Sequence, residues 1–252
     1  MCRHLGYLGP PASPAGLVFG APHSLLHQSY APADMRGGGS VNADGFGMAW
    51  YTGDSPVRYR RAGPIWTDQD APVLARSVRT GAFVAAVRNG TPGMPATEAA
   101  VAPFVDGRWS FSHNGMVTGW PGSLAELAGK LPAADLLTLE APTDSAVLWA
   151  LLRERLRAGE DPVRASAELI TKVESAAPGS RLNLLLTDGE TLVATAWTHA
   201  LSLRESGGAV VVASEPTDTA PGWVPVPDRH AVVARGGPAE IIPLEADRSA
   251  RS

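Results

Sequence analysis

The chain has very little cysteine: one residue among 252, at position 2. A single cysteine excludes an intrachain disulfide, which agrees with a reducing compartment. Long apolar runs are also absent, and the N-terminal segment lacks a charged stretch followed by a continuous apolar one. The sequence therefore predicts neither a membrane span nor a secretory signal peptide, and we expect a cytoplasmic protein.

Clustered positive charge is missing as well. The 21 Lys and Arg residues are scattered, and 25 Asp and Glu residues give a net charge of -4. Nucleic-acid binding requires a basic patch or stripe, so no nucleic-acid partner is predicted. We expect a small-molecule substrate, and the composition does not indicate an oligomeric state.

What is present is a globular composition, with 44% hydrophobic residues, 18% charged residues and 27 glycines. This length is sufficient for one domain with a large core. No internal repeat and no linker divides the chain. We expect a single domain over residues 2–244, followed by a polar tail over 245–252.

Short apolar or alternating runs predict strands. Residues 108–113 alternate between two faces and are followed by Asn114 and Gly115, which we interpret as a turn. Asp188 and Gly189 join two runs as a hairpin, so we expect largely antiparallel sheets. The other predicted strands cover residues 46–51, 57–61, 82–87, 182–186, 192–197, 209–213 and 231–234.

Helical spacing of apolar residues begins after Thr143 and Asp144 and ends before Gly159. A second helix is predicted after Asp161, which provides an N-cap and is followed by a first-turn proline. The order is therefore strands, helices, strands. The glycines at 37–39 lie in a segment with little periodicity and predict a mobile surface loop.

Cys2 directly follows the initiator Met1, which cells commonly remove when the next side chain is small. Cys2 would then carry a thiol and a free α-amine on one residue. Their reference pKa values are about 8.5 and about 7.7 to 8.0, so a proton passes easily from sulfur to nitrogen near neutral pH. An N-terminal amine can activate a nucleophile in this way. The alternative is an inert thiol that acts as a small hydrophobic residue.

Three further positions suit a glutamyl substrate. The Arg88 guanidinium can hold a carboxylate through two hydrogen bonds, and Asp144 can accept an α-ammonium group. The side chain of Asn114 and the backbone N–H of Gly115 can stabilise an oxyanion. Each position also has a structural alternative: a strand-end ion pair for Arg88, a turn for Asn114 and Gly115, and a helix N-cap for Asp144.

Taken together, these residues and their neighbours match the motifs of a known protein family. The run from Arg88 to Gly93, the triplet His113–Asn114–Gly115, the pair Thr143–Asp144 and the N-terminal cysteine resemble the class II glutamine amidotransferase domain, within the N-terminal nucleophile hydrolases. More narrowly, the chain resembles the γ-glutamyl hydrolases of ergothioneine biosynthesis over about residues 2–244. The segments that carry this narrower resemblance are 2–9, 42–51 and 213–216, with Trp223 and Pro225 beyond them.

The resemblance implies an α+β fold, a four-layer αββα sandwich of two antiparallel sheets. It also implies that Cys2 is the nucleophile, that Asn114 and Gly115 form the oxyanion hole, and that Arg88 and Asp144 bind the glutamyl head group. Thr91 is expected to add a hydroxyl to carboxylate binding.

The chain departs from the family pattern at two positions in this loop. Asn89 stands where relatives commonly have an aromatic residue, and Pro92 stands where they have a backbone N–H donor. Proline has no N–H to donate, so carboxylate binding should depend more on Arg88 and Thr91. The departure also puts any gating role of the aromatic residue in doubt.

Other candidates have weaker support. The segment 42–47 could line the site, but a turn leading into a strand explains it more simply. His23 and His27 have the spacing of a helical metal pair without further ligands nearby, so we predict no metal, and no organic cofactor is implied. Trp66, Trp120 and Tyr30 are candidates for a cation–π contact with a trimethylammonium group, although packing explains each of them as well.

The predicted reaction is hydrolysis of a γ-glutamyl amide through a γ-glutamyl thioester on Cys2, and the favoured substrate is γ-glutamyl hercynylcysteine sulfoxide, by resemblance. Two alternatives remain. The first is a glutaminase subunit that supplies ammonia to a separate synthase. The second is a non-catalytic ligand-binding module with the same fold.

Overall fold

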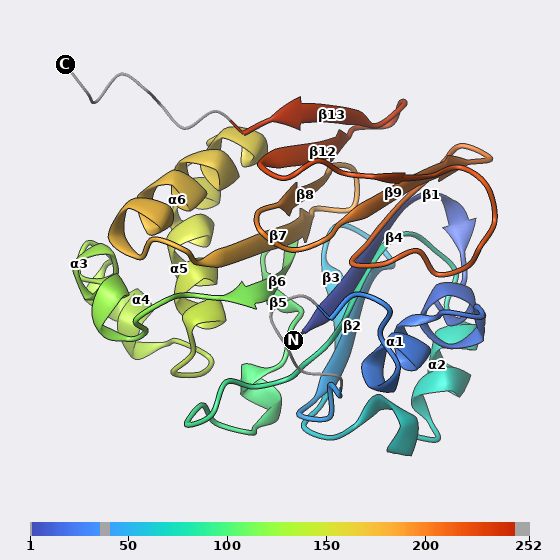
Figure 1. Cartoon of the computed structure of the whole chain (residues 1–252), viewed down its shortest axis with the longest axis horizontal. Coiled ribbons are helices and arrows are strands. Elements are labelled where there is room, and N and C mark those ends of the chain that lie inside the picture. Colours follow the sequence, from blue (N-terminus) through green and yellow to red (C-terminus); the bar gives the residue numbers. More distant parts are fainter. Residues whose placement is uncertain (1, 36–40, 245–252) are drawn as a thin grey trace.

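The computed structural model describes residues 2–35 and 41–244, which form two antiparallel sheets with helices on their outer faces (Figure 1). The first sheet has seven strands in the order β11-β9-β10-β1-β4-β2-β3. Their bounds are β1 Arg3–Ala12, β2 Phe46–Tyr51, β3 Pro56–Arg61, β4 Thr80–Val87, β9 Ser202–Ser206, β10 Ala209–Ala213 and β11 Trp223–Pro225.

The second sheet has six strands in the order β13-β12-β8-β7-β6-β5. Their bounds are β5 Phe104–Asp106, β6 Trp109–Met116, β7 Arg181–Thr187, β8 Leu192–Ala196, β12 His230–Ala234 and β13 Glu240–Pro243. All strand pairs of both sheets are antiparallel.

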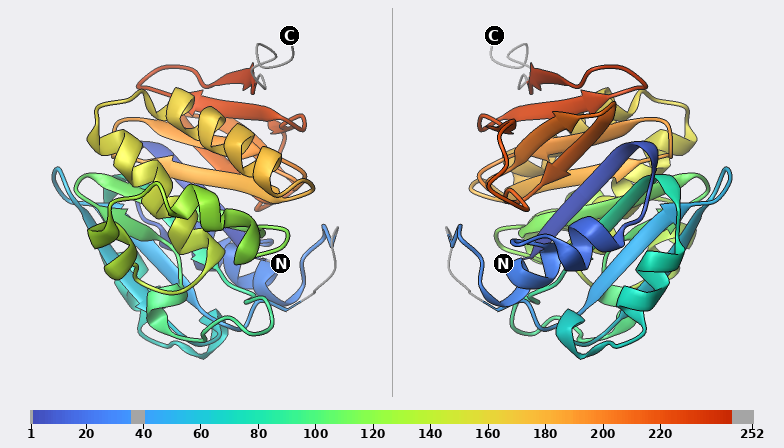
Figure 2. Two further views of the ribbon diagram at one scale, coloured as in Figure 1. Left: turned by 90° about the vertical axis from the view of Figure 1, so that its left-hand side faces the viewer. Right: turned by 90° about the vertical axis from the view of Figure 1, so that its right-hand side faces the viewer.

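Helices cover the outer face of each sheet, so the molecule has four layers, αββα (Figure 2). Helices α1 (Leu25–Tyr30) and α2 (Ala71–Ser77) pack on the first sheet. Helices α5 (Asp144–Arg157) and α6 (Pro162–Ala176) pack on the second. The short helices are η1 Gly16–Gly20, η2 Ile65–Thr67, η3 Glu98–Ala100, η4 Gly122–Leu124, α3 Ala125–Ala128 and α4 Ala133–Leu137.

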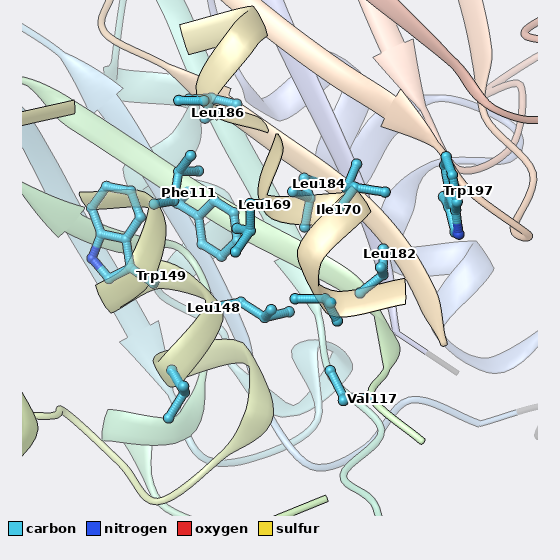
Figure 3. Packing of buried hydrophobic residues seen from close by; sticks show 14 of the residues in the cluster. Phe111, Val117, Leu148, Trp149, Leu169, Ile170, Leu182, Leu184, Leu186 and Trp197 are labelled. Atoms are coloured by element: carbon cyan, nitrogen blue, oxygen red, sulfur yellow. The ribbon is translucent and has the colours of Figure 1, made fainter. Parts of the chain in front are cut away.

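Strand alternation explains how the second sheet serves two cores. Leu182, Leu184 and Leu186 of β7 face α5 and α6, whereas Leu185 faces the other sheet. Figure 3 shows the helix side of this layer, where the rings of Phe111 and Trp149 stack with their centroids 5.2 Å apart.

The fold confirms the predicted αββα sandwich, and the predicted strands lie within two residues of their expected bounds, apart from β6, which ends three residues beyond the predicted strand 108–113. The two long helices begin where they were expected. One interpretation was wrong: Asn114 and Gly115 do not form a turn, because β6 continues through them to Met116. Strand β1 and the short strands β5, β9, β11 and β13 were not predicted. The glycines 37–39 and the tail 245–252 lie outside the described residues.

Within residues 2–35 and 41–244, no helix has the length and apolar character needed to cross a bilayer.

Candidate active site

Cys2 lies one residue before β1, and the N-terminal end of the chain is marked near the centre of Figure 1. Strand alternation puts it on the same face as His4, the face that looks toward the second sheet. Its thiol contacts the carbonyl oxygen of Asn89, with Sγ and O 3.7 Å apart. A cavity of about 30 Å³ adjoins Cys2, and Arg88, His113 and Ser145 also line it. Cys2 therefore borders a small cavity whose wall is mostly apolar, with Arg88, His113 and Ser145 as its other polar residues.

Arg88 follows the end of β4 and lies in the wall of the same cavity. Its backbone is fixed on both sides, because its N–H donates to the carbonyl oxygen of Gly45 at 2.7 Å and its carbonyl accepts from the N–H of Asp44 at 3.0 Å. The Asp44 carboxylate also accepts from the N–H of Gly90 at 2.7 Å. The segment 42–47, which we interpreted as a supporting turn, thus braces the arginine.

The Arg88 guanidinium is buried, and none of the described residues provides a counterion for it. The residue is 8% exposed, and its Nη2 is buried with no hydrogen-bond partner in the described part of the chain. No ion pair between described residues includes Arg88. The strand-end ion pair considered as the alternative is therefore not seen among these residues. A buried charge without a partner is costly, so this arrangement is suited to an anion from outside the protein.

Gly90 lets the backbone pass close to this guanidinium. A Cβ added to Gly90 would lie 3.0 Å from Nη2 and 3.1 Å from Cζ of Arg88. Thr91 follows and is half-buried in the same loop, where its carbonyl accepts from the N–H of Met94 at 3.0 Å. Arg88 at the start of this loop lines the cavity at Cys2, whereas Thr91, whose hydroxyl we assigned to carboxylate binding, is not among the residues that line it.

Asn114 lies on the face of β6 that looks toward the first sheet, as does Ser112, whose hydroxyl contacts His4 at 3.2 Å. The Asn114 Nδ2 donates to the Ser214 hydroxyl at 3.1 Å, and the Ser214 hydroxyl and N–H both bond to the carbonyl of His4. An amide Nδ2 has two hydrogens, so one remains for an oxyanion. Ser214 thus links Asn114 to the strand that begins at Cys2.

The backbone around Gly115 leaves no space for a side chain. A Cβ at this position would lie 1.8 Å from the carbonyl oxygen of Arg181 and 2.6 Å from Nε2 of His113. The close approach of β7 therefore requires glycine at this position. This packing requirement could not be predicted from the sequence.

Asp144 is the first residue of α5, while the N-cap is Thr143, whose hydroxyl accepts from the N–H of Ala146 at 3.2 Å. The N-cap alternative for Asp144 was therefore wrong. Its carboxylate is buried and accepts from the backbone N–H of Val117 at 3.0 Å and of Ser145 at 2.7 Å. These two backbone donors and the N-terminus of α5 hold the carboxylate in place. Further lone pairs remain on both oxygens for an ammonium group.

A buried ion pair between Arg3 and Glu215 holds the N-terminal strand. It was not predicted from the sequence. The Arg3 Nε donates to Oε1 of Glu215 at 2.8 Å, and Arg3 also donates to the carbonyl oxygens of Cys2 and Asp34. The other oxygen of Glu215 accepts from the N–H of Ala33 at 2.7 Å. The only sequence signal for this network was the segment 213–216, quoted for its resemblance and not for a role.

The two histidines at 23 and 27 contact each other, and His23 also contacts Glu215. Their Nδ1 atoms are 3.0 Å apart, and Nε2 of His23 lies 2.7 Å from Oε2 of Glu215. They do not share one helix, because His23 precedes the Ser24 N-cap of α1. Within the described ranges, no group of three or more His, Cys, Asp or Glu side chains has metal-binding geometry.

The aromatic candidates lie elsewhere. Tyr30 and Trp66 pack edge to face on the surface, and Trp120 packs against the core beside α5 and α6. None of the three lines the cavity at Cys2 or the larger cavity described next.

A larger cavity, of about 800 Å³, lies beside a small pocket that Asn114 lines. It shares Asp34, His199, Ala200 and Ser214 with a small pocket that Asn114 and Arg3 line. The cavity at Cys2 and Arg88 shares no lining residue with either of these two cavities.

Comparison with known proteins identifies the family. A family model described as glutamine amidotransferases class-II matches residues 16–206. This chain belongs to the class II glutamine amidotransferases. The gamma-glutamyl-hercynylcysteine sulfoxide hydrolase of Mycolicibacterium smegmatis is 40% identical over 97% of this chain and 100% of its own length. The protein of that name from Mycobacterium tuberculosis is also 40% identical, over 92% of each chain.

A solved structure shares the fold. The glutamine aminotransferase class-II domain protein from Silicibacter pomeroyi superposes with a TM-score of 0.67, at 24% identity, over 95% of this chain and 98% of its own. For this class II glutamine amidotransferase, the family and the fold implied by the sequence resemblance are both confirmed. The roles of the individual site residues remain predictions, which the geometry above makes specific.

Proposed function

We propose that this protein hydrolyses a γ-glutamyl amide, with Cys2 as the nucleophile. The observation that carries the proposal is the buried guanidinium of Arg88, which has no counterion among the described residues and lies in the wall of the cavity at Cys2. The α-carboxylate of a glutamyl group would supply the missing counterion through two parallel hydrogen bonds. Asp144 would accept the α-ammonium group, which leaves the γ-carbonyl to meet the thiol.

The reaction proceeds in two steps after Met1 is removed. The Cys2 thiol passes its proton to the Cys2 α-amine, and the thiolate attacks the γ-carbonyl. Asn114 and Gly115 donate hydrogen bonds to the oxyanion. The C–N bond breaks as the ammonium returns its proton to the leaving amine, and a γ-glutamyl thioester forms. Water, deprotonated by the same amine, then attacks the thioester and releases glutamate and the thiol.

The favoured substrate is γ-glutamyl hercynylcysteine sulfoxide. Two relatives at 40% identity are named as hydrolases of that compound. The cavity of about 800 Å³ beyond Asn114 supports a bulky leaving group, since ammonia from glutamine would need no such space.

The test compares glutamate release from γ-glutamyl hercynylcysteine sulfoxide and from free glutamine, by wild type and Cys2→Ala. We expect fast release from the conjugate, slow release from glutamine, and loss of both in the variant. Equal rates with the two substrates would favour a glutaminase subunit instead. Retention of Met1, seen by intact mass together with no release, would favour a binding module.

A further inference from the structure

Ser145, the second residue of α5, lines the cavity at Cys2 and is the one hydroxyl-bearing residue that does so in the described part of the chain. Asp144, which precedes it, is not among the lining residues. The two carboxylate oxygens of Asp144 accept from the backbone N–H groups of Val117 and Ser145. Ser145 is therefore the residue at the start of α5 that borders the same space as Cys2 and Arg88.

The hydrogen of the Ser145 hydroxyl is directed by His113, which lines the same cavity. Nε2 of His113 lies 2.8 Å from the carbonyl oxygen of Arg181, and since a carbonyl only accepts, this nitrogen carries a hydrogen. In the neutral imidazole the other nitrogen, Nδ1, is then an acceptor, and it lies 2.9 Å from Oγ of Ser145. The Ser145 O–H therefore donates to His113, and the lone pairs of Oγ remain for a ligand.

The surroundings of Oγ favour a cation as that ligand. Oγ of Ser145 lies 3.4 Å from Oδ1 of Asp144, which is longer than the usual O–H···O range of about 2.5 to 3.0 Å. Two acceptor oxygens therefore lie side by side. An ammonium group has three N–H donors and no acceptor, so it can donate to both oxygens at once. A carboxylate would meet acceptors at both atoms, and its complement is the Arg88 guanidinium in the same cavity wall.

We propose that Ser145 accepts a hydrogen bond from the α-ammonium group of the γ-glutamyl substrate, beside the carboxylate of Asp144. The inference rests on the proposed function and adds to it a residue that determines specificity for a free α-amino group. Arg88 and Ser145 border one cavity, so they can hold the α-carboxylate and the α-ammonium group of the same molecule. Both groups are attached to one carbon, and fixing both orients the γ-carbonyl toward the thiol of Cys2.

The test uses two compounds that differ only in the α-ammonium group: γ-glutamyl hercynylcysteine sulfoxide and its glutaryl analogue. KM is measured for the first, and the constant for competitive inhibition, Ki, for the second. Ser145→Ala should raise KM about 10-fold, because a hydrogen bond to a charged group contributes that much, and should leave Ki within about 2-fold of wild type. Ser145→Thr, which retains a hydroxyl, should restore most of the lost affinity. Neither constant depends on the fraction of the variant that folds.

The outcomes separate this proposal from the one on which it rests. An unchanged KM in Ser145→Ala, or an equal rise of KM and Ki, would overturn the role of Ser145 in ammonium binding, while γ-glutamyl hydrolysis stands. The control is Ser77→Ala, at the exposed last residue of α2, which should have the constants of wild type. If wild type releases no glutamate from the γ-glutamyl substrate, the proposed function itself is wrong, and the role of Ser145 with it.

Discussion

Cys2 and Arg88 lie opposite each other at the ends of two neighbouring strands. β1 and β4 pair in a register that places Arg3 across from Val87, and the next pair in that register is Cys2 with Arg88. Both residues line the same cavity of about 30 Å³. The strand pairing therefore holds the proposed nucleophile beside the proposed carboxylate site.

Replacing Arg88 by lysine should weaken substrate binding. The charge is retained, but the bidentate fork is lost, and a shorter-reaching ammonium leaves one carboxylate oxygen without its donor. We expect KM for the γ-glutamyl substrate to rise about 10- to 100-fold, measured by steady-state glutamate release. Arg108→Lys, at an exposed arginine that pairs with Glu190, serves as the control and should have wild-type kinetics. An unchanged KM in Arg88→Lys would remove Arg88 from the site.

Replacing Asn114 by alanine should reduce kcat more than KM. The Nδ2 donor acts on charge that develops in the transition state, and loss of one such donor lowers kcat about 100- to 1000-fold. Ser214→Ala leaves the amide in place and removes only its partner, so a smaller loss is expected. Steady-state kinetics of both variants give the comparison. A rise in KM with unchanged kcat in Asn114→Ala would assign the residue to substrate binding only.

Replacing Gly115 by alanine should destabilise the fold. A Cβ 1.8 Å from the Arg181 carbonyl forces β6 away from β7, and we expect a loss of at least about 3 kcal/mol in the free energy of unfolding. The control is Gly122→Ala, because a Cβ at Gly122 has nothing within 4 Å. Urea unfolding of the two variants measures the difference. Similar stabilities would show that the strand accommodates the added carbon.

Acidification should destabilise the protein through its buried histidines. Burial lowers the pKa of His4 to about 3, and the pKa of His199 is lowered to about 3 mainly by the same cause. In the unfolded chain both titrate near 6.5, so the unfolded state binds more protons below that pH. Stability is fully present above about pH 6.5 and is lost as the pH falls toward 3, by up to about 1.4 kcal/mol per pH unit for each group.

Urea unfolding at a series of pH values measures this dependence. His4→Gln should reduce the slope between about pH 6.5 and 5, because one of the two groups no longer takes up a proton on unfolding. The same slope in wild type and variant would mean that His4 titrates normally in the folded protein.

Strands and helices whose hydrophobic pattern is visible in a short stretch of sequence could be predicted. The β2 run and the α5 stripe were located closely, because a buried strand and an amphipathic helix show in the pattern itself. β1 was not predicted, since Gly6, Gly9 and Pro10 interrupt its pattern. In the structure Gly6 allows close approach to Leu185 of the other sheet, which is a tertiary cause.

The candidate site could be predicted residue by residue but not as an arrangement. Arg88 and Asp144 were chosen for their chemistry, and the resemblance supplied their roles. The pair Asn114–Gly115 is typical of a hairpin turn, but here it continues strand β6. Its pairing with β7, where Gly115 packs against the backbone of Arg181, overrides the turn propensity. The ion pair of Arg3 with Glu215 joins residues 212 positions apart, and the placement of His199 depends on Asn183 and Asp228. No local pattern in the sequence encodes such contacts.

The most direct measurement of the central claim is the mass of the enzyme quenched with acid during turnover of γ-glutamyl hercynylcysteine sulfoxide. The account predicts a chain that begins at Cys2 and a fraction that carries one added γ-glutamyl group, located on the N-terminal residue by fragmentation and absent in Cys2→Ala. Glutamate release by a chain that retains Met1, or a γ-glutamyl group on another residue, would contradict it.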